Sequence, residues 1–191
     1  MSSYLETIKL EDGELCHIDY HQKRVDSVLK RKLNLEEIIS TCRDFPKWGL
    51  HRCRVVYGED GQSVSFHSYK KRDISTLKVV FDNNIEYSKK YENRDDLNKL
   101  FEQREGCDDV LIVKNLKVTD TTIANIAFYK DGRWVTPKEP LLKGTTRQRL
   151  LDDGFLVEED IMVQQLRTFE KVALLNAMIG FEIVENLEFL I

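Results

Sequence analysis

The fold of this chain is decided by residues 119–151, TDTTIANIAFYKDGRWVTPKEPLLKGTTRQRLL. In the middle of this stretch, Asp131-Gly132 separates two apolar runs, Ile126–Tyr129 and Trp134–Val135. An Asp-Gly pair between two alternating runs is a strong hairpin signal, because both residues tolerate the positive φ of a tight two-residue turn. The sequence therefore predicts a β-hairpin here.

The same stretch ends in a predicted helix. Gly144 precedes Thr145 and Thr146, and a helical run follows that ends before Gly154. A helix start leaves backbone N–H groups without partners inside the helix, and such a start attracts phosphate or carboxylate. The simpler interpretation is an ordinary capped helix, so the segments upstream must decide whether Gly144–Thr146 binds an anion.

The first third of the chain is predicted to form a small α/β unit. Apolar and polar residues alternate on both sides of a turn at Glu11-Asp12-Gly13, which is typical of a hairpin. The predicted elements are a hairpin of Tyr4–Leu10 with Glu14–Ile18, a helix capped by Asp19 and running to about Leu33, a helix capped by Asn34 that carries Cys42 and stops before Pro46, and strands at Leu50–Tyr57 and Ser63–Tyr69. A third strand-like run, Leu77–Phe81, follows beyond this unit.

The charged run Lys70-Lys71-Arg72-Asp73 is the best candidate for a linker. It divides the chain into a predicted small domain, residues 1–72, and a larger domain, residues 73–191. In the larger domain we expect a loop at Ile85–Asn93, a helix from about Arg94 to Gln103, a buried strand at Asp109–Val113, the hairpin and helix described above, a strand at Phe155–Glu158, a short helix near Val163–Arg167, a buried run at Val172–Leu175, a turn at Asn176-Ala177-Met178 and a strand at Phe181–Val184.

The composition describes an ordinary folded protein, with 41% hydrophobic and 32% charged residues. The net charge of −4 argues against a nucleic-acid binder, and no apolar run approaches membrane-spanning length. The start of the chain lacks the apolar core of a signal peptide. The four cysteines, Cys16, Cys42, Cys53 and Cys107, form no CxxC pair, so we interpret them as buried thiols in a reducing cytoplasm and expect no metal site.

Three groups of residues could carry chemistry. Lys89 and Lys90 lie in a polar loop before a helix, where most lysines are solvated; a reactive lysine needs burial or nearby positive charge. Arg24 lies one helical turn after His21, and its planar guanidinium suits phosphate, although a surface arginine is the simpler interpretation. Asp120 follows a strand-like run and is either a turn residue or a partner for a protonated ring nitrogen.

The order of the motifs is informative. They are YHQKR at Tyr20–Arg24, KYENR at Lys90–Arg94, TDTTIANIAF at Thr119–Phe128, WVTP at Trp134–Pro137, LLKGTTRQ at Leu141–Gln148 and LLNAMIG at Leu174–Gly180. This series resembles the class IV family of pyridoxal-phosphate (PLP) enzymes, which have fold type IV. That family includes branched-chain and D-amino-acid aminotransferases and aminodeoxychorismate lyase. The resemblance covers nearly the whole chain.

The resemblance implies a role for each matched residue. Lys90 matches the family lysine that binds the cofactor aldehyde covalently and moves the α-proton, and its neighbour Lys89 is the weaker candidate. Arg24 matches the arginine that holds the cofactor phosphate. PLP acts as the electron sink, so the protein supplies orientation and charge, and an arginine neutralises the phosphate without blocking the ring.

The resemblance extends to the second half of the chain. Thr145 and Thr146 match a helix start that donates N–H groups to the same phosphate. Asp120 stands where the family usually has a glutamate paired with the pyridine nitrogen, and a carboxylate there keeps that nitrogen protonated. Asn176 and Ala177 stand at the turn near the phosphate and the substrate carboxylate.

Two departures from the family pattern stand out. Family members normally begin with another strand or two and a Gly-Asp-Gly-like turn before the segment that matches Tyr4–Thr7, which here lies at the start. Those residues would shape the substrate side and the dimer surface. Asp120 is one methylene shorter than glutamate, so we expect it to reach the ring nitrogen only if the backbone approaches or a water bridges.

The resemblance implies a mixed α/β fold with a small N-terminal α/β domain, a larger β-barrel-like cofactor-binding domain, and PLP in the cleft between them. It also implies a cytoplasmic homodimer with a small amino-acid-like substrate and no nucleic acid or membrane partner. Within the family, the Lys-x-x-Asn-Arg spacing at Lys90–Arg94 and the Asn-Ala-Met turn most resemble aminodeoxychorismate lyase, which releases pyruvate and leaves p-aminobenzoate. The alternatives are an aminotransferase for branched-chain or D-amino acids and a non-catalytic relative that retained the fold.

Overall fold

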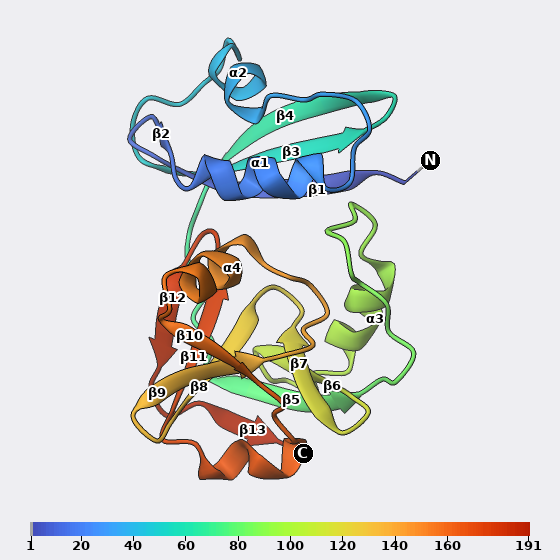
Figure 1. Ribbon diagram of the computed structural model, residues 1–191, viewed down its shortest axis with the longest axis vertical. Helices are drawn as coiled ribbons and strands as arrows, with labels where there is room; N and C mark the ends of the chain where they lie inside the picture. The colour runs from blue at the N-terminus through green and yellow to red at the C-terminus, as the bar shows by residue number, and fades with distance from the viewer. Residues whose placement is uncertain (1) are drawn as a thin grey trace. The chain divides into compact units, whose positions relative to one another are not determined.

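The computed structural model describes residues 2–191, and the chain folds into two compact units (Figure 1). The first unit takes in residues 2–71 together with Lys89–Asn93. The second takes in Arg72–Ser88 and Arg94–Ile191. The assignment of residues 1–72 and 73–191 as separate functional domains stays a prediction.

The first unit is built on an antiparallel sheet in the order β2-β1-β3-β4. Its strands are β1 (Tyr4–Glu11), β2 (Glu14–Leu15), β3 (Leu50–Gly58) and β4 (Gly61–Ser68). The long β1–β3 pairing puts Ile8 beside Cys53. The predicted hairpin is therefore confirmed, but its second strand stops at Leu15 rather than at Ile18, because the chain turns there into a helix.

Two helices, α1 (Ile18–Asp26) and α2 (Leu35–Ser40), cover one face of this sheet (Figure 1). The predicted cap of α2 is confirmed, since Asn34 Oδ1 accepts from the Glu37 N–H at 3.2 Å. The predicted cap of α1 is wrong. The helix begins after His17, which has a positive φ of 53° and makes no capping bond, and Asp19 lies in the first turn.

The end of α1 also differs from the prediction of a helix to about Leu33. Ser27 Oγ donates to the Arg24 carbonyl at 2.7 Å, and a serine that bonds the backbone in this way competes with further helix. Leu29 and Leu33 are nevertheless buried in the core of the unit. The spacing of these two leucines resembles that of a helix, but they lie in an irregular segment. Their apolar character reflects burial in the core and does not indicate a longer helix.

The second unit contains a mixed sheet in the order β10-β9-β8-β7-β6-β5-β13, and β11 joins it by pairing with β8 and β12. Parallel pairs are β5–β6, β5–β13 and β9–β10, and the others are antiparallel. The strands are β5 (Thr76–Phe81), β6 (Asp109–Lys114), β7 (Lys117–Thr121), β8 (Asn125–Lys130), β9 (Arg133–Pro137), β10 (Leu156–Glu159), β11 (Lys171–Asn176), β12 (Gly180–Val184) and β13 (Glu188–Leu190).

Three helical segments belong to the second unit, α3 (Asp95–Glu102), α4 (Thr145–Asp152) and the 3₁₀ helix η1 (Val163–Thr168). The hairpin predicted at Asp131-Gly132 joins β8 to β9, and both turn residues have positive φ, 51° and 79°. The short strand β13 was not predicted, because three residues are too few to show the alternation of apolar and polar side chains that indicates a strand. The fold class, a mixed α/β structure with large sheets, agrees with the prediction.

The segment Lys89–Asn93 belongs to the first unit although its neighbours in sequence belong to the second. The Leu5 N–H donates to the Lys90 carbonyl at 2.8 Å, and Tyr91 forms a single bridge with Tyr4 on β1. Arg54 on β3 makes an ion pair with Glu92 at 3.1 Å. Backbone bonds to β1 thus hold the lysine-bearing loop against the first unit.

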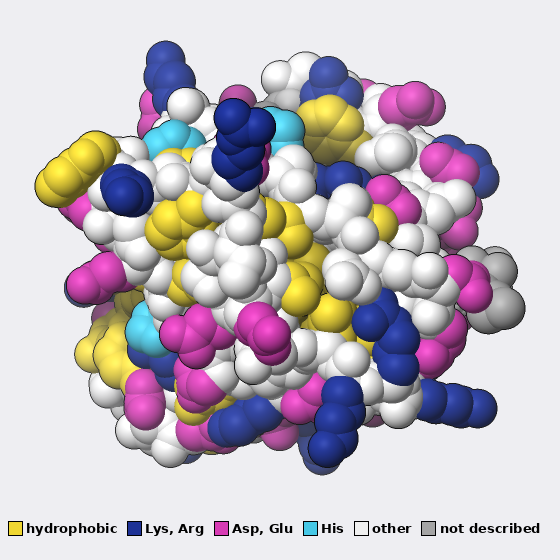
Figure 2. Space-filling model, turned by 90° about the horizontal axis from the view of Figure 1, so that it is seen from above, with side chains coloured by type: hydrophobic (Ala, Val, Ile, Leu, Met, Phe, Trp, Pro, Cys, Tyr) yellow, Lys and Arg dark blue, Asp and Glu magenta, His cyan; other side chains and the backbone are white. Residues whose placement is uncertain are grey.

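The surface carries charges of both signs. On the face shown in Figure 2, Lys and Arg side chains alternate with Asp and Glu side chains and with small hydrophobic areas. All four cysteines are free thiols; Cys53 and Cys107 are buried as predicted, whereas Cys16 and Cys42 are half-buried. Within residues 2–191, no helix has both the length and the apolar character needed to cross a bilayer.

Candidate active site

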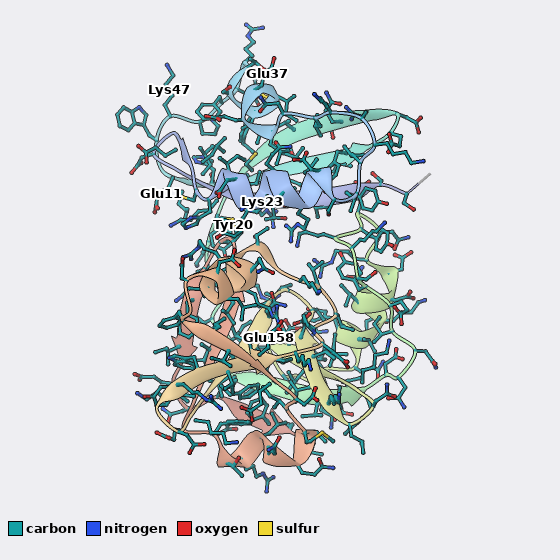
Figure 3. The ribbon with its side chains drawn as sticks, in the orientation of Figure 1. Glu11, Tyr20, Lys23, Glu37, Lys47 and Glu158 are labelled. Atoms are coloured by element: carbon teal, nitrogen blue, oxygen red, sulfur yellow. The ribbon has the colours of Figure 1, made fainter. Side chains whose placement is uncertain are left out.

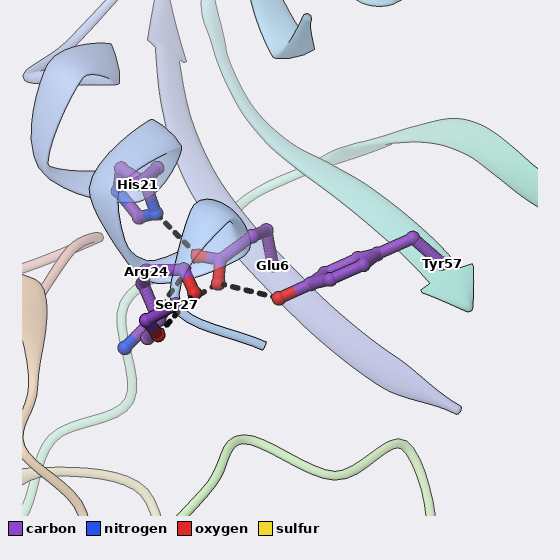
Figure 4. A network of polar contacts seen from close by, with 5 residues as sticks. All are labelled: Glu6, His21, Arg24, Ser27 and Tyr57. Atoms are coloured by element: carbon purple, nitrogen blue, oxygen red, sulfur yellow. Dashed lines mark hydrogen bonds and ion pairs between the residues drawn. The ribbon is translucent and has the colours of Figure 1, made fainter. Parts of the chain in front are cut away.

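A buried carboxylate organises the candidate residues of the first unit (Figure 4). Glu6 on β1 is fully buried and receives hydrogen bonds from two directions. Arg24 on α1 donates through Nε to Oε1 at 2.7 Å and through Nη2 to Oε2 at 2.5 Å. His21, one turn earlier on α1, lies with Nδ1 2.5 Å from Oε2. Tyr57 on β3 donates to Oε1 at 3.4 Å.

The charges in this group are well defined. Burial opposes the ionisation of Glu6, but Arg24 and His21 outweigh it and lower the pKa of Glu6 to about 2. Burial lowers the pKa of His21, with contributions from the charges of Arg24 and Lys90, so the ring is neutral at neutral pH. Because an ionised carboxylate only accepts, His21 Nδ1 is the donor. Burial and Glu6 raise the pKa of Tyr57, which keeps its proton.

The two lysines of the loop differ in environment. Lys90 is half-buried, and its positive charge acts on His21. Lys89 is exposed, with its ammonium 5.8 Å from the centre of the Tyr4 ring. The first unit therefore brings Lys90 into the electrostatic neighbourhood of His21 and Arg24.

In the second unit, Asp120 near the end of β7 is buried and held by two donors. Asn125 Nδ2 donates to its Oδ1 at 2.7 Å, and the Leu142 N–H donates to its Oδ2 at 2.9 Å. Burial raises the pKa of Asp120 to about 6, against the opposing effects of these donors and of the Arg147 charge. Because its pKa is close to neutral pH, this carboxyl group loses its proton readily when a cation lies beside it.

The start of α4 is as predicted, with Gly144 at the N-cap and Thr145 and Thr146 buried in the first turn. Gly144 has no side chain that could cap the helix. A Cβ at Gly144 would lie 2.1 Å from Asn125 Oδ1, so glycine is required by the close approach of β8. Asn125 also donates to the Leu142 carbonyl at 2.8 Å, which ties the loop before α4 to Asp120.

Arg147 in the first turn of α4 is almost completely buried. Its Nη2 donates to the Pro137 carbonyl at 2.8 Å and to Glu158 on β10, labelled in Figure 3, at 2.7 Å. Its Nε has no hydrogen-bond partner among residues 2–191. Since buried donors are almost always satisfied, an unpartnered guanidinium N–H indicates a site that suits an acceptor such as an anion.

Asn176 lies at the turn after β11, as the sequence predicts. Its Oδ1 accepts from the N–H groups of Met178 and Ile179 at 2.9 and 3.0 Å, and its Nδ2 donates to the Ile123 carbonyl at 3.3 Å. Ala177, the next residue, is half-buried. The Asn176 side chain therefore shapes the turn.

Comparisons with known proteins identify the family of this chain. The model of the family described as amino-transferase class IV matches residues 3–187. The chain belongs to the class IV aminotransferase family. This class IV chain is 34% identical to a protein of Haemophilus influenzae called "Uncharacterized protein", over 94% of this chain and the whole of that relative.

Two solved structures add to the comparison. The crystal structure of a candidate 4-amino-4-deoxychorismate lyase from Haemophilus somnus is 34% identical, covers 94% of this chain and 98% of that chain, and has a TM-score of 0.84. A PLP-bound hypothetical aminotransferase from Mycobacterium tuberculosis shares the fold, with a TM-score of 0.81, 17% identity, and coverage of 98% and 81%. Class IV members depend on PLP, and this chain is a PLP-dependent enzyme of that class.

Each unit by itself offers groups that suit a part of this cofactor. PLP carries an anionic phosphate, an aldehyde and a ring nitrogen that becomes cationic when protonated. The class IV chain offers a half-buried lysine and a guanidinium in the first unit. In the second unit it offers a buried carboxyl group and a helix start whose Arg147 retains an unpartnered donor.

Sequence reasoning missed three residues that contact the predicted site residues within their own units. Glu6 and Tyr57 come from strands far from Arg24 in sequence, and no local signal links them. Asn125 lies five residues after Asp120, and the sequence marks it only as one of the small residues that follow this aspartate. One signal was available for Glu6: it is an acidic residue at an inward position of a strand whose next inward residues, Ile8 and Leu10, are apolar.

Proposed function

We propose that this chain is a 4-amino-4-deoxychorismate lyase, which converts its substrate to p-aminobenzoate and pyruvate. One observation carries the proposal: the similarity to the candidate lyase from Haemophilus somnus extends over nearly the whole of both chains at 34% identity. The Lys-x-x-Asn-Arg sequence at Lys90–Arg94 supports it. The aminotransferase structure at 17% identity supports the fold alone.

Within this proposal, Lys90 Nζ would hold the cofactor through its aldehyde and would accept the proton from the substrate Cα. Its half-buried position suits a lysine that must lose its proton at intervals, because burial disfavours the charged form. Bound PLP supplies the electron sink that makes this proton acidic. Lys89, which is exposed, remains the weaker candidate.

Arg24 and the start of α4 hold the phosphate in this proposal. Arg24 donates from a guanidinium whose orientation is set by Glu6. Thr145 and Thr146 contribute backbone N–H groups, which carry the positive end of the helix dipole. Asp120 accepts from the protonated ring nitrogen, while Asn176 and Ala177 lie at the turn that meets the substrate carboxylate.

We also propose that the enzyme is a homodimer with a small amino-acid-like substrate, because class IV members usually are. The same residues would serve an aminotransferase for branched-chain or D-amino acids up to removal of the α-proton. The two reactions then diverge. The lyase would release pyruvate from its substrate, whereas the aminotransferase would release a 2-oxo acid and keep the amino group for a second substrate.

The test has two parts. Purified protein reconstituted with PLP is assayed for pyruvate release from aminodeoxychorismate and for amino transfer to 2-oxoglutarate. We expect pyruvate and p-aminobenzoate in equal amounts, and loss of at least about 10³-fold in rate for Lys90→Ala, because the covalent and proton-transfer roles disappear together.

Borohydride trapping followed by peptide mapping locates the reactive amine. We expect the label on Lys90, and Lys89→Ala serves as the matched control that retains both label and activity. Amino transfer without pyruvate would replace the lyase assignment with the alternative. A label on Lys89, or scattered labelling, would contradict the assignment of Lys90.

A further inference from the structure

Glu6 is the one acidic side chain on the inward face of β1. The residues that follow it on that face, Ile8 and Leu10, are fully buried members of the apolar core under α1 and α2. Glu6 itself is 0% exposed, yet ionised, with a pKa lowered to about 2. Ionised carboxylates are rarely placed in a core without a partner and a reason.

The partner is Arg24, and the contact is bidentate. Nε and Nη2, on one edge of the guanidinium, each donate to a different oxygen of Glu6, at 2.7 and 2.5 Å. Two parallel bonds fix both the position and the plane of the guanidinium, whereas a single bond would allow it to rotate. His21 and Tyr57 also contact the carboxylate, so the carboxylate is itself held in place (Figure 4).

A contribution to stability alone does not explain this arrangement. A buried ion pair typically stabilises a fold no more than apolar side chains of similar size, because desolvation offsets the attraction. The two partners also differ in exposure. Glu6 is fully enclosed, while the Arg24 side chain is 13% exposed. The buried Glu6 carboxylate thus holds the Arg24 guanidinium, part of which reaches the surface of its own unit.

We propose that Glu6 is a positioning residue that holds the Arg24 guanidinium in the orientation that binds the phosphate of the cofactor. This inference rests on the proposed role of Arg24 in the enzyme. A countercharge alone would weaken an anion site, because it neutralises the arginine. A positioning carboxylate strengthens the site, because the guanidinium is ordered before the phosphate arrives.

The experiment compares two ligands that differ only in the phosphate. Dissociation constants for PLP and for pyridoxal are measured by absorbance titration of the wild type, Glu6→Gln, Glu6→Asp and Glu11→Gln. The ratio of the pyridoxal constant to the PLP constant reports the phosphate contribution. We expect both Glu6 variants to lower this ratio about tenfold, as for the loss of one charge-assisted hydrogen bond.

The variants separate orientation from charge. Glu6→Asp keeps the charge but is one methylene too short to keep both bonds to Arg24, and it serves if Glu6→Gln does not fold. Glu11→Gln removes the exposed carboxylate at the end of β1, which pairs with Lys9 and not with Arg24, so its ratio should stay within about twofold of the wild type. In an Arg24→Lys background, the Glu6 substitutions should no longer change the ratio.

Three outcomes would overturn the proposal. Equal weakening of PLP and pyridoxal would make Glu6 a purely structural residue. A rise in PLP affinity for Glu6→Gln would make it a countercharge. An unchanged ratio in both variants would show that Arg24 needs no orientation. Failure of the proposed enzyme role is a different result: the wild type itself would then bind PLP no better than pyridoxal.

Discussion

Asp120 is a residue whose surroundings favour its neutral form, and this has a consequence for pH. Burial raises the pKa of Asp120 from 3.8 to about 6. A carboxyl group with a raised pKa stabilises the folded state when protonated, and that contribution is complete below pH 3.8 and is lost as the pH rises through about 6. The difference between the two pKa values corresponds to about 3 kcal/mol of unfolding free energy.

We therefore expect Asp120→Asn to change the pH dependence of stability. The unfolding free energy of the wild type minus that of the variant, both without cofactor, should fall by up to about 3 kcal/mol between about pH 4 and about pH 7. Urea denaturation at a series of pH values measures it. The control is Asp131→Asn, an exposed residue of the hairpin turn, which should follow the wild type. A constant difference for Asp120→Asn would show that Asp120 does not titrate in this range.

At the scale of elements, β8 and α4 meet where Gly144 approaches Asn125. A Cβ at Gly144 would lie 2.1 Å from Asn125 Oδ1, so Gly144→Ala must displace the amide that holds Asp120. We expect a loss of stability of about 1–3 kcal/mol, as for other overpacked sites, and weaker PLP binding. Thermal unfolding and PLP titration measure the two effects.

The control for this substitution is Gly61→Ala. Gly61 begins β4, and an added Cβ there meets no atom within 4 Å, so the stability should change by less than about 0.5 kcal/mol. The double variant Gly144→Ala/Asn125→Ala removes the clashing amide. It should recover stability relative to Gly144→Ala alone, and absence of any recovery would show that the two elements are not coupled through this contact.

At the scale of the whole molecule, we expect a dimer. The second unit exposes several large hydrophobic side chains on its strands and loops: Phe81, Leu116, Phe155, Val157, Ile183 and Leu190. A chain of 22.4 kDa would give a mass of twice that value, 44.8 kDa, in sedimentation equilibrium. A mass near 22.4 kDa at micromolar concentration, with enzyme activity retained, would contradict the dimer.

Local signals determined much of the fold. Asp131-Gly132 predicted a tight hairpin because few residue pairs accept positive φ at both positions, and the two φ values confirm it. Gly144 with two threonines predicted the start of α4. Local signals failed at α1, where apolar spacing predicted helix as far as Leu33, but Ser27 ends the helix and the later apolar residues pack without it.

By itself, the sequence determined which residues could react and in what order they occur, since the motifs around Arg24, Lys90, Asp120 and Gly144 are contiguous and readable. Only the tertiary structure decided what each of them contacts. Glu6 meets Arg24 across 18 positions, and Gly144 meets Asn125 from a different element. Such contacts depend on strand register and side-chain burial, which arise only when the whole chain packs. They therefore produce no pattern among residues that are adjacent in sequence.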